Sequence, residues 1–165
     1  MPFRSRLALK QPFETWPLME LAGEQRYWDS LALALADSGN ETGALYLLGY
    51  VAEMLLKTAY FRVISLPPSD DIGPSLRAAN RDAHWRGGNL HNLGSWFYLL
   101  GDIRFFQGRP WDAAQAATVE RHVLTVDSHW RETLRYTFVA AETSELEEAF
   151  ASVDWLLANY VVLWR

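Results

Sequence analysis

The chain has 165 residues and a formal net charge of −5; 50% of its residues are hydrophobic and 14% are aromatic. This length and apolar content suit a single globular domain, residues 1–165, with a core of its own. The absence of cysteine excludes disulfides and thiolate metal sites and is typical of a reducing compartment. The acidic balance argues against a broad nucleic-acid-binding surface.

We expect a cytoplasmic protein that holds no metal and no cofactor. The N-terminal sequence has basic residues but no apolar stretch of signal-peptide length, and no apolar run is long enough to span a membrane. The four histidines lack the short spacing of zinc ligands. No glycine-rich phosphate loop, nucleophile elbow or pair of metal-binding carboxylates is found.

Two long helices are predicted at the start of the chain. Pro17 suits the first turn of a helix, and apolar residues then recur at helical spacing as far as Leu35, before Gly39 ends the run. Asn40 can cap the next helix, expected over about residues 41–64, where two consecutive prolines follow soon after. The short connection would make these helices antiparallel neighbours.

The middle of the chain predicts a short helix and another long one. The short helix follows Pro74 and is broken by the glycine pair that begins at Gly87. Asn89 is the expected N-cap of the long helix. Its apolar residues keep helical spacing as far as Phe106, ahead of a glycine and a proline that end it.

The C-terminal part predicts two further helices. One begins near Pro110, runs to about Val126 and continues loosely through the sequence DSHWRETLRYTF. The other opens at a capping box of Ser144 and Glu147 and keeps helical spacing to the end of the chain. Because strand patterns are nearly absent, we expect an all-α fold: an antiparallel up-and-down bundle of four long helices plus a shorter helix.

The helix predicted at residues 41–64 carries one polar stripe. At 100° per residue, this stripe contains Tyr46, Tyr50, Glu53, Lys57 and Tyr60, while the rest of the helix is apolar on nearly every side and so is expected to be buried. Glu53 and Lys57 are then either an exposed ion pair, worth about 0.2–0.5 kcal/mol, or a pair held partly out of water. In the second case, loss of one partner would cost about 3–5 kcal/mol.

Three segments, in order along the chain, resemble the HEPN family (higher eukaryote and prokaryote nucleotide-binding domains). YLLGYVAEMLLKTAY is similar to its signature helix, GNLHNLGSWFYLL to a later His-Asp-Leu stretch, and HWRETLRYTF to a downstream Trp then Arg-Tyr segment. The matching residues are Tyr46, Gly49, Tyr50, Glu53, Leu56, Lys57, His91, Leu93, Trp130, Arg135 and Tyr136, with Asn92 where the family has Asp.

The resemblance implies a small helical bundle, often a homodimer, of bacterial toxin-antitoxin and defence systems. In many of these systems the bundle is encoded beside a minimal nucleotidyltransferase. Some members are metal-independent endoribonucleases with an Arg-x4-6-His motif, and others bind nucleotides or have no known catalysis. The resemblance therefore leaves open whether this protein is an enzyme.

Two residue pairs match the spacing of that motif: Arg86 with His91, and Arg77 with His84. We favour Arg86 and His91 as catalytic residues, since His91 lies in a matched segment near a predicted helix N-terminus, where backbone N–H groups attract phosphate. His91 would act as the base for a ribose 2′-hydroxyl, and Arg86 would stabilise the charged phosphorane. The alternative is a structural histidine beside a flexible glycine turn.

The stripe residues Tyr50, Glu53 and Lys57, joined by Arg135 and Tyr136, could form a basic, aromatic-lined groove for a nucleotide. The alternative for the last two is an arginine that caps a helix and a tyrosine that packs on the core. The eight tryptophans are most simply core residues, although an exposed subset would mark a dimer face.

Arginines concentrate in the middle of the chain. Between residues 73 and 110, Arg77, Arg81, Arg86, Arg104 and Arg109 are opposed by two acids. A site for an anion, if there is one, is therefore expected in this segment.

We predict a HEPN-like protein that binds or cleaves RNA or nucleotides in a prokaryotic toxin-antitoxin or defence setting, as a metal-independent endoribonuclease if it is catalytic. The alternative is a non-catalytic, dimeric helical binding module. In that case the stripe of Tyr50, Glu53 and Lys57 would dock a partner protein such as a nucleotidyltransferase.

Overall fold

A computed structural model of the protein describes residues 14–36, 39–131, 133–134 and 140–165, which form seven helices and no strand. The helices are α1 (Trp16–Ala34), α2 (Glu41–Val63), α3 (Gly73–Ala79), α4 (Leu93–Phe106), α5 (Ala113–His129), α6 (Thr143–Ala158) and α7 (Tyr160–Trp164). The predicted all-α class is confirmed. In the described ranges, none of the helices has the length and apolar character needed to cross a membrane.

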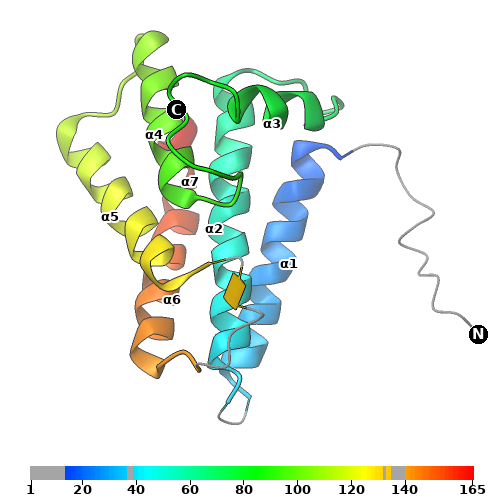
Figure 1. Cartoon of the computed structure of the whole chain (residues 1–165), viewed down its shortest axis with the longest axis vertical. Coiled ribbons are helices and arrows are strands. Elements are labelled where there is room, and N and C mark those ends of the chain that lie inside the picture. Colours follow the sequence, from blue (N-terminus) through cyan, green and yellow to red (C-terminus); the bar gives the residue numbers. More distant parts are fainter. Residues whose placement is uncertain (1–13, 37–38, 132, 135–139) are drawn as a thin grey trace, which may run out of the picture.

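Helix α2 lies at the centre of the fold. It packs against α1, α4 and α6, and also touches α5 and α7. Figure 1 shows α1 and α2 side by side and antiparallel along the long axis, with α3 across one end of the molecule. The fully buried apolar residues of α2 include Ala44, Leu45, Leu48, Val51, Ala52, Leu56, Ala59, Phe61 and Val63. Contacts on all sides explain why this helix is apolar nearly all round.

The first two predicted helices are confirmed as α1 and α2. Pro17 lies in the first turn of α1, and Asn40 occupies the N-cap position of α2. Gly39, between them, has a φ of 109°, which residues with a Cβ rarely adopt. Glycine at this position therefore suits the backbone that leads into α2.

The predicted start of the third long helix is wrong by about one turn. Asn92, not Asn89, is the N-cap of α4, and its Oδ1 accepts a hydrogen bond from the Ser95 backbone N–H at 2.7 Å. The Oδ1 atom of Asn89 instead accepts from the backbone N–H of His91 at 3.0 Å. Asn89 thus closes a turn that presents His91 just ahead of the helix.

The predicted capping box of the last helix is also wrong. Glu142 is the N-cap of α6, and its backbone N–H donates to the side chain of Glu145 at 2.9 Å. The N-terminus of the helix is thus capped through Glu142 and Glu145, and not through Ser144 and Glu147 as the sequence predicted. The predicted single helix is moreover divided at Asn159, where α6 ends and α7 begins.

Helix α5 corresponds to the predicted fourth helix. It begins after Asp112, whose Oδ1 accepts from the Gln115 backbone N–H at 2.8 Å, and it extends to His129, slightly beyond the expected end. The next residue, Trp130, is buried. Part of the predicted loose continuation lies outside the described residues.

Candidate functional site

Helix α2 holds Glu53 and Lys57 inside the protein. Their side chains are only 5% and 8% exposed, and the Lys57 Nζ donates a hydrogen bond to Glu53 Oε1. The Lys57 ammonium also lies 5.7 Å from the ring centre of Trp96 on α4. The interpretation as an exposed surface pair is wrong, and the alternative, a pair held away from water, is the one that the fold adopts.

The second oxygen of Glu53 connects this pair to His91. Glu53 Oε2 lies 2.9 Å from His91 Nδ1, across 38 residues of sequence. The side chain of His91 is 37% exposed, so the contacts lead from a buried ammonium to the protein surface. We call Lys57, Glu53 and His91 the polar triad.

The contact with Glu53 indicates which ring nitrogen of His91 carries a proton. Glu53 also accepts from the Lys57 ammonium, and an ionised carboxylate can only accept hydrogen bonds. Nδ1 of His91 is therefore the nitrogen that carries a proton toward Glu53. In the neutral ring the lone pair is then on Nε2, which is the arrangement that lets a histidine act as a base.

Aromatic rings enclose the polar triad. The ring of Tyr50 makes edge-to-face contacts with His91, Trp130 and Tyr46, at centroid distances of 6.2, 5.4 and 5.0 Å. The hydroxyl oxygens of Tyr46 and Tyr50 are 3.0 Å apart, and the Trp130 Nε1–H donates to the Tyr46 carbonyl at 3.1 Å. These contacts restrict the orientation of the imidazole.

A small polar pocket lies beside His91. It has a volume of about 180 Å³, and its lining residues are Asn89, His91, Asn92, Asp127, Trp130, Arg131 and Thr133. One water molecule occupies about 30 Å³ of liquid, so the pocket has room for roughly six. This space suits one phosphate-sized group, whereas sites for whole small molecules are usually larger, about 300–1,000 Å³.

Arg86 is directed toward α4. Its guanidinium lies 4.3 Å from the ring centre of Tyr98, and its Nη2 is 4.0 Å from Asp102 Oδ2. The histidine of the other motif match, His84, is near the same acid, with Nδ1 at 3.4 Å. The fold therefore brings Tyr50, Lys57, Glu53 and His91 together around one carboxylate and holds Arg86 against a different one.

The other two predicted groove residues, Arg135 and Tyr136, lie outside the described residues. In the described ranges, no group of three or more histidine, aspartate or glutamate side chains is placed to hold a metal ion.

Sequence reasoning missed the close packing of Trp130 on Gly49. A Cβ atom built on Gly49 would lie 2.0 Å from ring atoms of Trp130, far inside van der Waals contact. Glycine in the middle of a run of good helix formers was the signal that another group approaches the backbone here. The pairing partner itself could not be read from the pattern.

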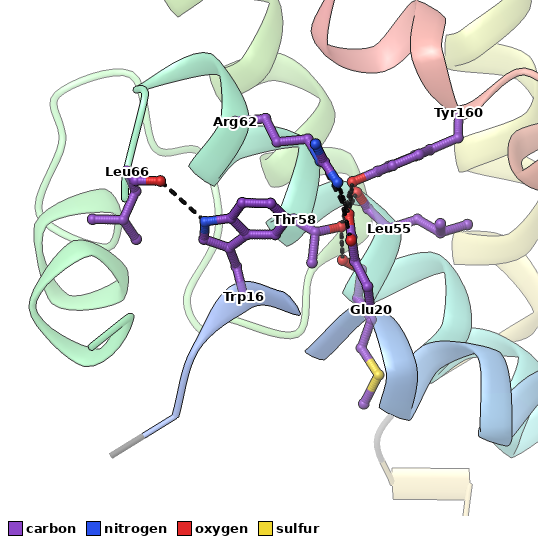
Figure 2. Close-up of polar contacts among 8 residues, drawn as sticks. Trp16, Glu20, Leu55, Thr58, Arg62, Leu66 and Tyr160 are labelled. Carbon is purple, nitrogen blue, oxygen red and sulfur yellow. Dashed lines mark hydrogen bonds and ion pairs between the residues drawn. The ribbon is translucent and has the colours of Figure 1, made fainter. Parts of the chain in front are cut away.

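A second polar cluster, also missed, joins α1, α2 and α7 (Figure 2). The Arg62 guanidinium binds both carboxylate oxygens of Glu20 at 2.8–3.0 Å, and the Tyr160 hydroxyl lies 2.8 Å from both Glu20 Oε1 and Thr58 Oγ1. Arg62 also stacks on Trp16, with 4.3 Å to the ring centre. Burial and the bond to Glu20 raise the pKa of Tyr160. Since its members satisfy one another, this cluster is best explained as a clamp between helices.

Comparisons of the chain with models of known protein families, with curated proteins and with solved structures found no match. The resemblance to HEPN domains accordingly rests on the three segments quoted above.

Proposed function

We propose that the protein is a HEPN-like RNA- or nucleotide-binding protein of a prokaryotic toxin-antitoxin or defence system, and that His91 is the group that meets the phosphate backbone. One observation carries the proposal: the hydrogen-bonded path from Lys57 through Glu53 to His91, which ends at the rim of a phosphate-sized polar pocket. Taking an ion pair out of water costs free energy. A role in orienting a half-exposed histidine would explain why the protein keeps this pair in its interior.

The proposed reaction is metal-independent cleavage of RNA. His91 Nε2 takes the proton of a ribose 2′-hydroxyl, whose oxygen attacks the neighbouring phosphorus while the bond to the 5′-oxygen breaks. The products are a 2′,3′-cyclic phosphate and a 5′-alkoxide, which takes a proton from water or from the imidazolium formed at His91 and leaves as the 5′-hydroxyl. Glu53 and Lys57 act as positioning residues, because Glu53 bonds to the histidine and Lys57 bonds to Glu53, both from inside the protein.

The motif match assigns the positive charge of this scheme to Arg86. Its guanidinium lies at Tyr98 and Asp102 and would have to turn from them toward a phosphate bound at His91. Its side chain is 59% exposed, and its contact with Asp102 is long, at 4.0 Å. Exposed ion pairs of this kind contribute about 0–1 kcal/mol, so a phosphate group can compete for the guanidinium. The developing charge of the phosphorane would then be stabilised by Arg86.

The test is incubation of the purified protein with end-labelled RNA in the presence of a chelator. We expect cleavage by the wild type, none by His91→Ala and less by Glu53→Gln. His129→Gln is the matched control, because this histidine also contacts carboxylates, those of Glu145 and Glu148. RNA binding without cleavage, lost in His91→Ala, would assign a binding role. Neither binding nor cleavage by the wild type would contradict the proposal.

A dimeric, non-catalytic module is the second candidate. Glu53 and Lys57 are too deeply buried to form its docking surface. Helix α1 and its C-cap instead expose Leu21, Trp28 and Leu35, spaced seven residues apart. Seven-residue spacing places apolar side chains along one face, as in helices that pair, so we propose a second copy of this chain as the occupant.

Light scattering across a concentration series tests the dimer. We expect a dimer for the wild type and a folded monomer for Trp28→Lys, because a charge in an apolar interface is strongly unfavourable. A wild type that stays monomeric at the highest concentration would contradict this candidate.

A further inference from the structure

Arg104, in the last turn of α4, is buried without the partners that a guanidinium needs. The residue is 4% exposed, yet its Nε and Nη1 atoms are buried and have no hydrogen-bond partner among the described residues. Burial of a charged group is strongly unfavourable unless the group is paired and hydrogen-bonded. An unpaired arginine in this position calls for an explanation.

The side chain lines an open pocket that is rich in positive charge. The pocket has a volume of about 420 Å³ and includes Arg104, Arg109, Gln115 and Arg165, with apolar residues on its other walls and no acidic residue. Burial and the nearby charge of Arg109 lower the pKa of Arg104. The charge of Arg109 thus repels this guanidinium instead of pairing with it.

The turn after α4 brings the two arginines together. Gly108 adopts a left-handed conformation with a φ of 70°. The Arg109 N–H then donates to the Arg104 carbonyl at 2.9 Å, and the Gly108 N–H to the Phe105 carbonyl at 3.0 Å. This is the Schellman arrangement of a helix end. Arg109 is therefore returned to the turn of helix that carries Arg104.

Trp111 makes this region rigid. Its ring stacks on Phe97 with a centroid distance of 5.4 Å and an interplanar angle of 6°, and its Nε1–H donates to the Val162 carbonyl of α7 at 2.7 Å. The Arg104 guanidinium lies 5.1 Å from the Trp111 ring centre. The donors of Arg104 are thereby held in place before any ligand arrives.

We propose that this pocket binds the phosphate group of a small phosphate monoester of mononucleotide size. Arginine matches phosphate because its planar fork of N–H groups donates to two oxygens at once. The oxygens would accept from Arg109 and from the part of the Arg104 guanidinium that borders the pocket. The charge of the phosphate would also compensate the buried guanidinium, whose Nε and Nη1 atoms have almost no accessible surface. A cation is favoured at a helix C-terminus, which partly explains why a charged side chain is tolerated here. The helix end nevertheless supplies no acceptor for the Nε and Nη1 donors of Arg104.

The remainder of the ligand has a place in the adjoining pocket. That pocket has a volume of about 300 Å³, shares Gln115 and Val162 with the arginine pocket and reaches Trp155. An aromatic or apolar body attached to the phosphate could therefore extend along α5 toward this ring. None of the residues of either pocket lines the pocket of His91, so the inference stands apart from the proposed RNA site.

Calorimetric titration with AMP, inorganic phosphate and adenosine tests the site. We expect AMP to bind, phosphate to bind more weakly and adenosine not to bind. Arg109→Gln should weaken AMP binding by about tenfold or more, because one charge-assisted contact is lost. Arg81→Gln, which removes an exposed arginine from the turn that follows α3, is the control for net charge and should bind AMP as the wild type does.

The buried arginine gives a second, independent measurement. Arg104→Met should abolish AMP binding and leave the ligand-free protein at least as resistant to heat, because an unpaired buried charge has been removed. If Arg104→Met fails to fold, the comparison of Arg109→Gln with Arg81→Gln decides. No binding of AMP or phosphate at millimolar concentration, or equal binding by Arg109→Gln and the wild type, would overturn the proposal. Phosphate binding that AMP does not improve would overturn the mononucleotide size.

Discussion

Glu53 has two hydrogen-bonding partners, one on each carboxylate oxygen, and the fold depends on both contacts in different ways. Lys57 neutralises the charge of Glu53 within α2, and His91 attaches the turn before α4 to the same carboxylate. Removing any one of these groups leaves another in a place from which water is largely excluded. The cost of such a change is therefore expected to exceed the small value of an exposed ion pair.

Single substitutions in the buried pair should be strongly destabilising. We expect Glu53→Gln and Lys57→Met each to lower the free energy of unfolding by about 3–5 kcal/mol, because each leaves an uncompensated buried charge. The double variant Glu53→Leu with Lys57→Met should lose less than the sum of the two. Urea denaturation monitored by tryptophan fluorescence measures all three.

The exposed pair Arg26 and Asp29 on α1 serves as the control for this prediction. Their side chains are 47% and 38% exposed, with the charged atoms 3.0 Å apart. Asp29→Asn should change the free energy of unfolding by about 0.5 kcal/mol or less. Equal small losses in Glu53→Gln and Asp29→Asn would contradict the account of the buried pair.

His122 predicts a dependence of stability on pH. Its ring stacks on Trp155 at a centroid distance of 4.5 Å, and burial, followed by the charge of Arg121, lowers its pKa. A histidine whose pKa is lower in the folded state binds fewer protons there than in the unfolded state. Its contribution to stability is present above the ordinary histidine pKa of about 6.5 and is lost as pH falls through the folded value.

The difference between wild type and His122→Gln isolates this contribution. Histidines titrate between about pH 7 and pH 5. Over this range we expect the free energy of unfolding to fall by more in the wild type than in the variant. Other histidines contribute equally to both proteins and cancel. Parallel losses in the two proteins, measured by urea denaturation at each pH, would show that His122 titrates alike in both states.

At the scale of the helices, the contact of Gly49 in α2 with Trp130 after α5 should be intolerant of added volume. Gly49→Ala would place a methyl group inside the Trp130 ring, so the tryptophan would have to move. We expect a loss of about 1–3 kcal/mol in the free energy of unfolding. Displacement of Trp130 would also disturb Tyr50, which packs on it.

Gly101→Ala in α4 is the matched control. A Cβ at Gly101 would meet Trp111 at 3.5 Å, an ordinary contact. Alanine in a helix interior is favoured over glycine by about 0.5–1 kcal/mol, so this variant should be as stable as the wild type or more so. Thermal and urea denaturation of the two variants should thus give changes of opposite sign, and changes of the same sign and size would contradict the packing account.

The sequence predicted the helices best where a single pattern determined them. Helix α2 was identified because a long apolar run between a glycine and two prolines has few other solutions. The start of α4 was missed because Asn89 and Asn92 are both good N-cap residues. Which of them caps the helix depends on tertiary contacts. One such contact is the N–H of Leu93, which donates to Asp127 of α5 at 3.2 Å. The break between α6 and α7 at Asn159 was missed because the apolar residues keep helical spacing on both sides of it.

The candidate site was predicted in part. Tyr50, Glu53 and Lys57 share one face by helical geometry alone, and His91 was selected by its segment. The bond from His91 to Glu53 could not be predicted, since nothing local specifies a contact across 38 residues. The same holds for Arg104. It is the buried one among the five arginines of residues 73–110, and that burial depends on the turn at Gly108 and on α7.

Across the whole molecule, α2 connects two polar clusters of different character. One of its faces carries Glu53 and Lys57 to the turn before α4, and another carries Thr58 and Arg62 to α1 and α7. The members of the second cluster bond to one another and hold three helices together. The first ends at a histidine that water and ligands can reach, which is why the proposed chemistry is assigned to His91.

The most direct test of the account is an NMR titration of protein labelled with ¹⁵N-histidine against a short RNA. In the free protein, at a pH where the ring is neutral, the nitrogen shifts of His91 should show the proton on Nδ1, as the bond to Glu53 requires. Addition of RNA should shift the His91 signals while those of His129 stay in place. An imidazole protonated at Nε2, or His91 signals that do not change when RNA is in excess, would contradict the central claim.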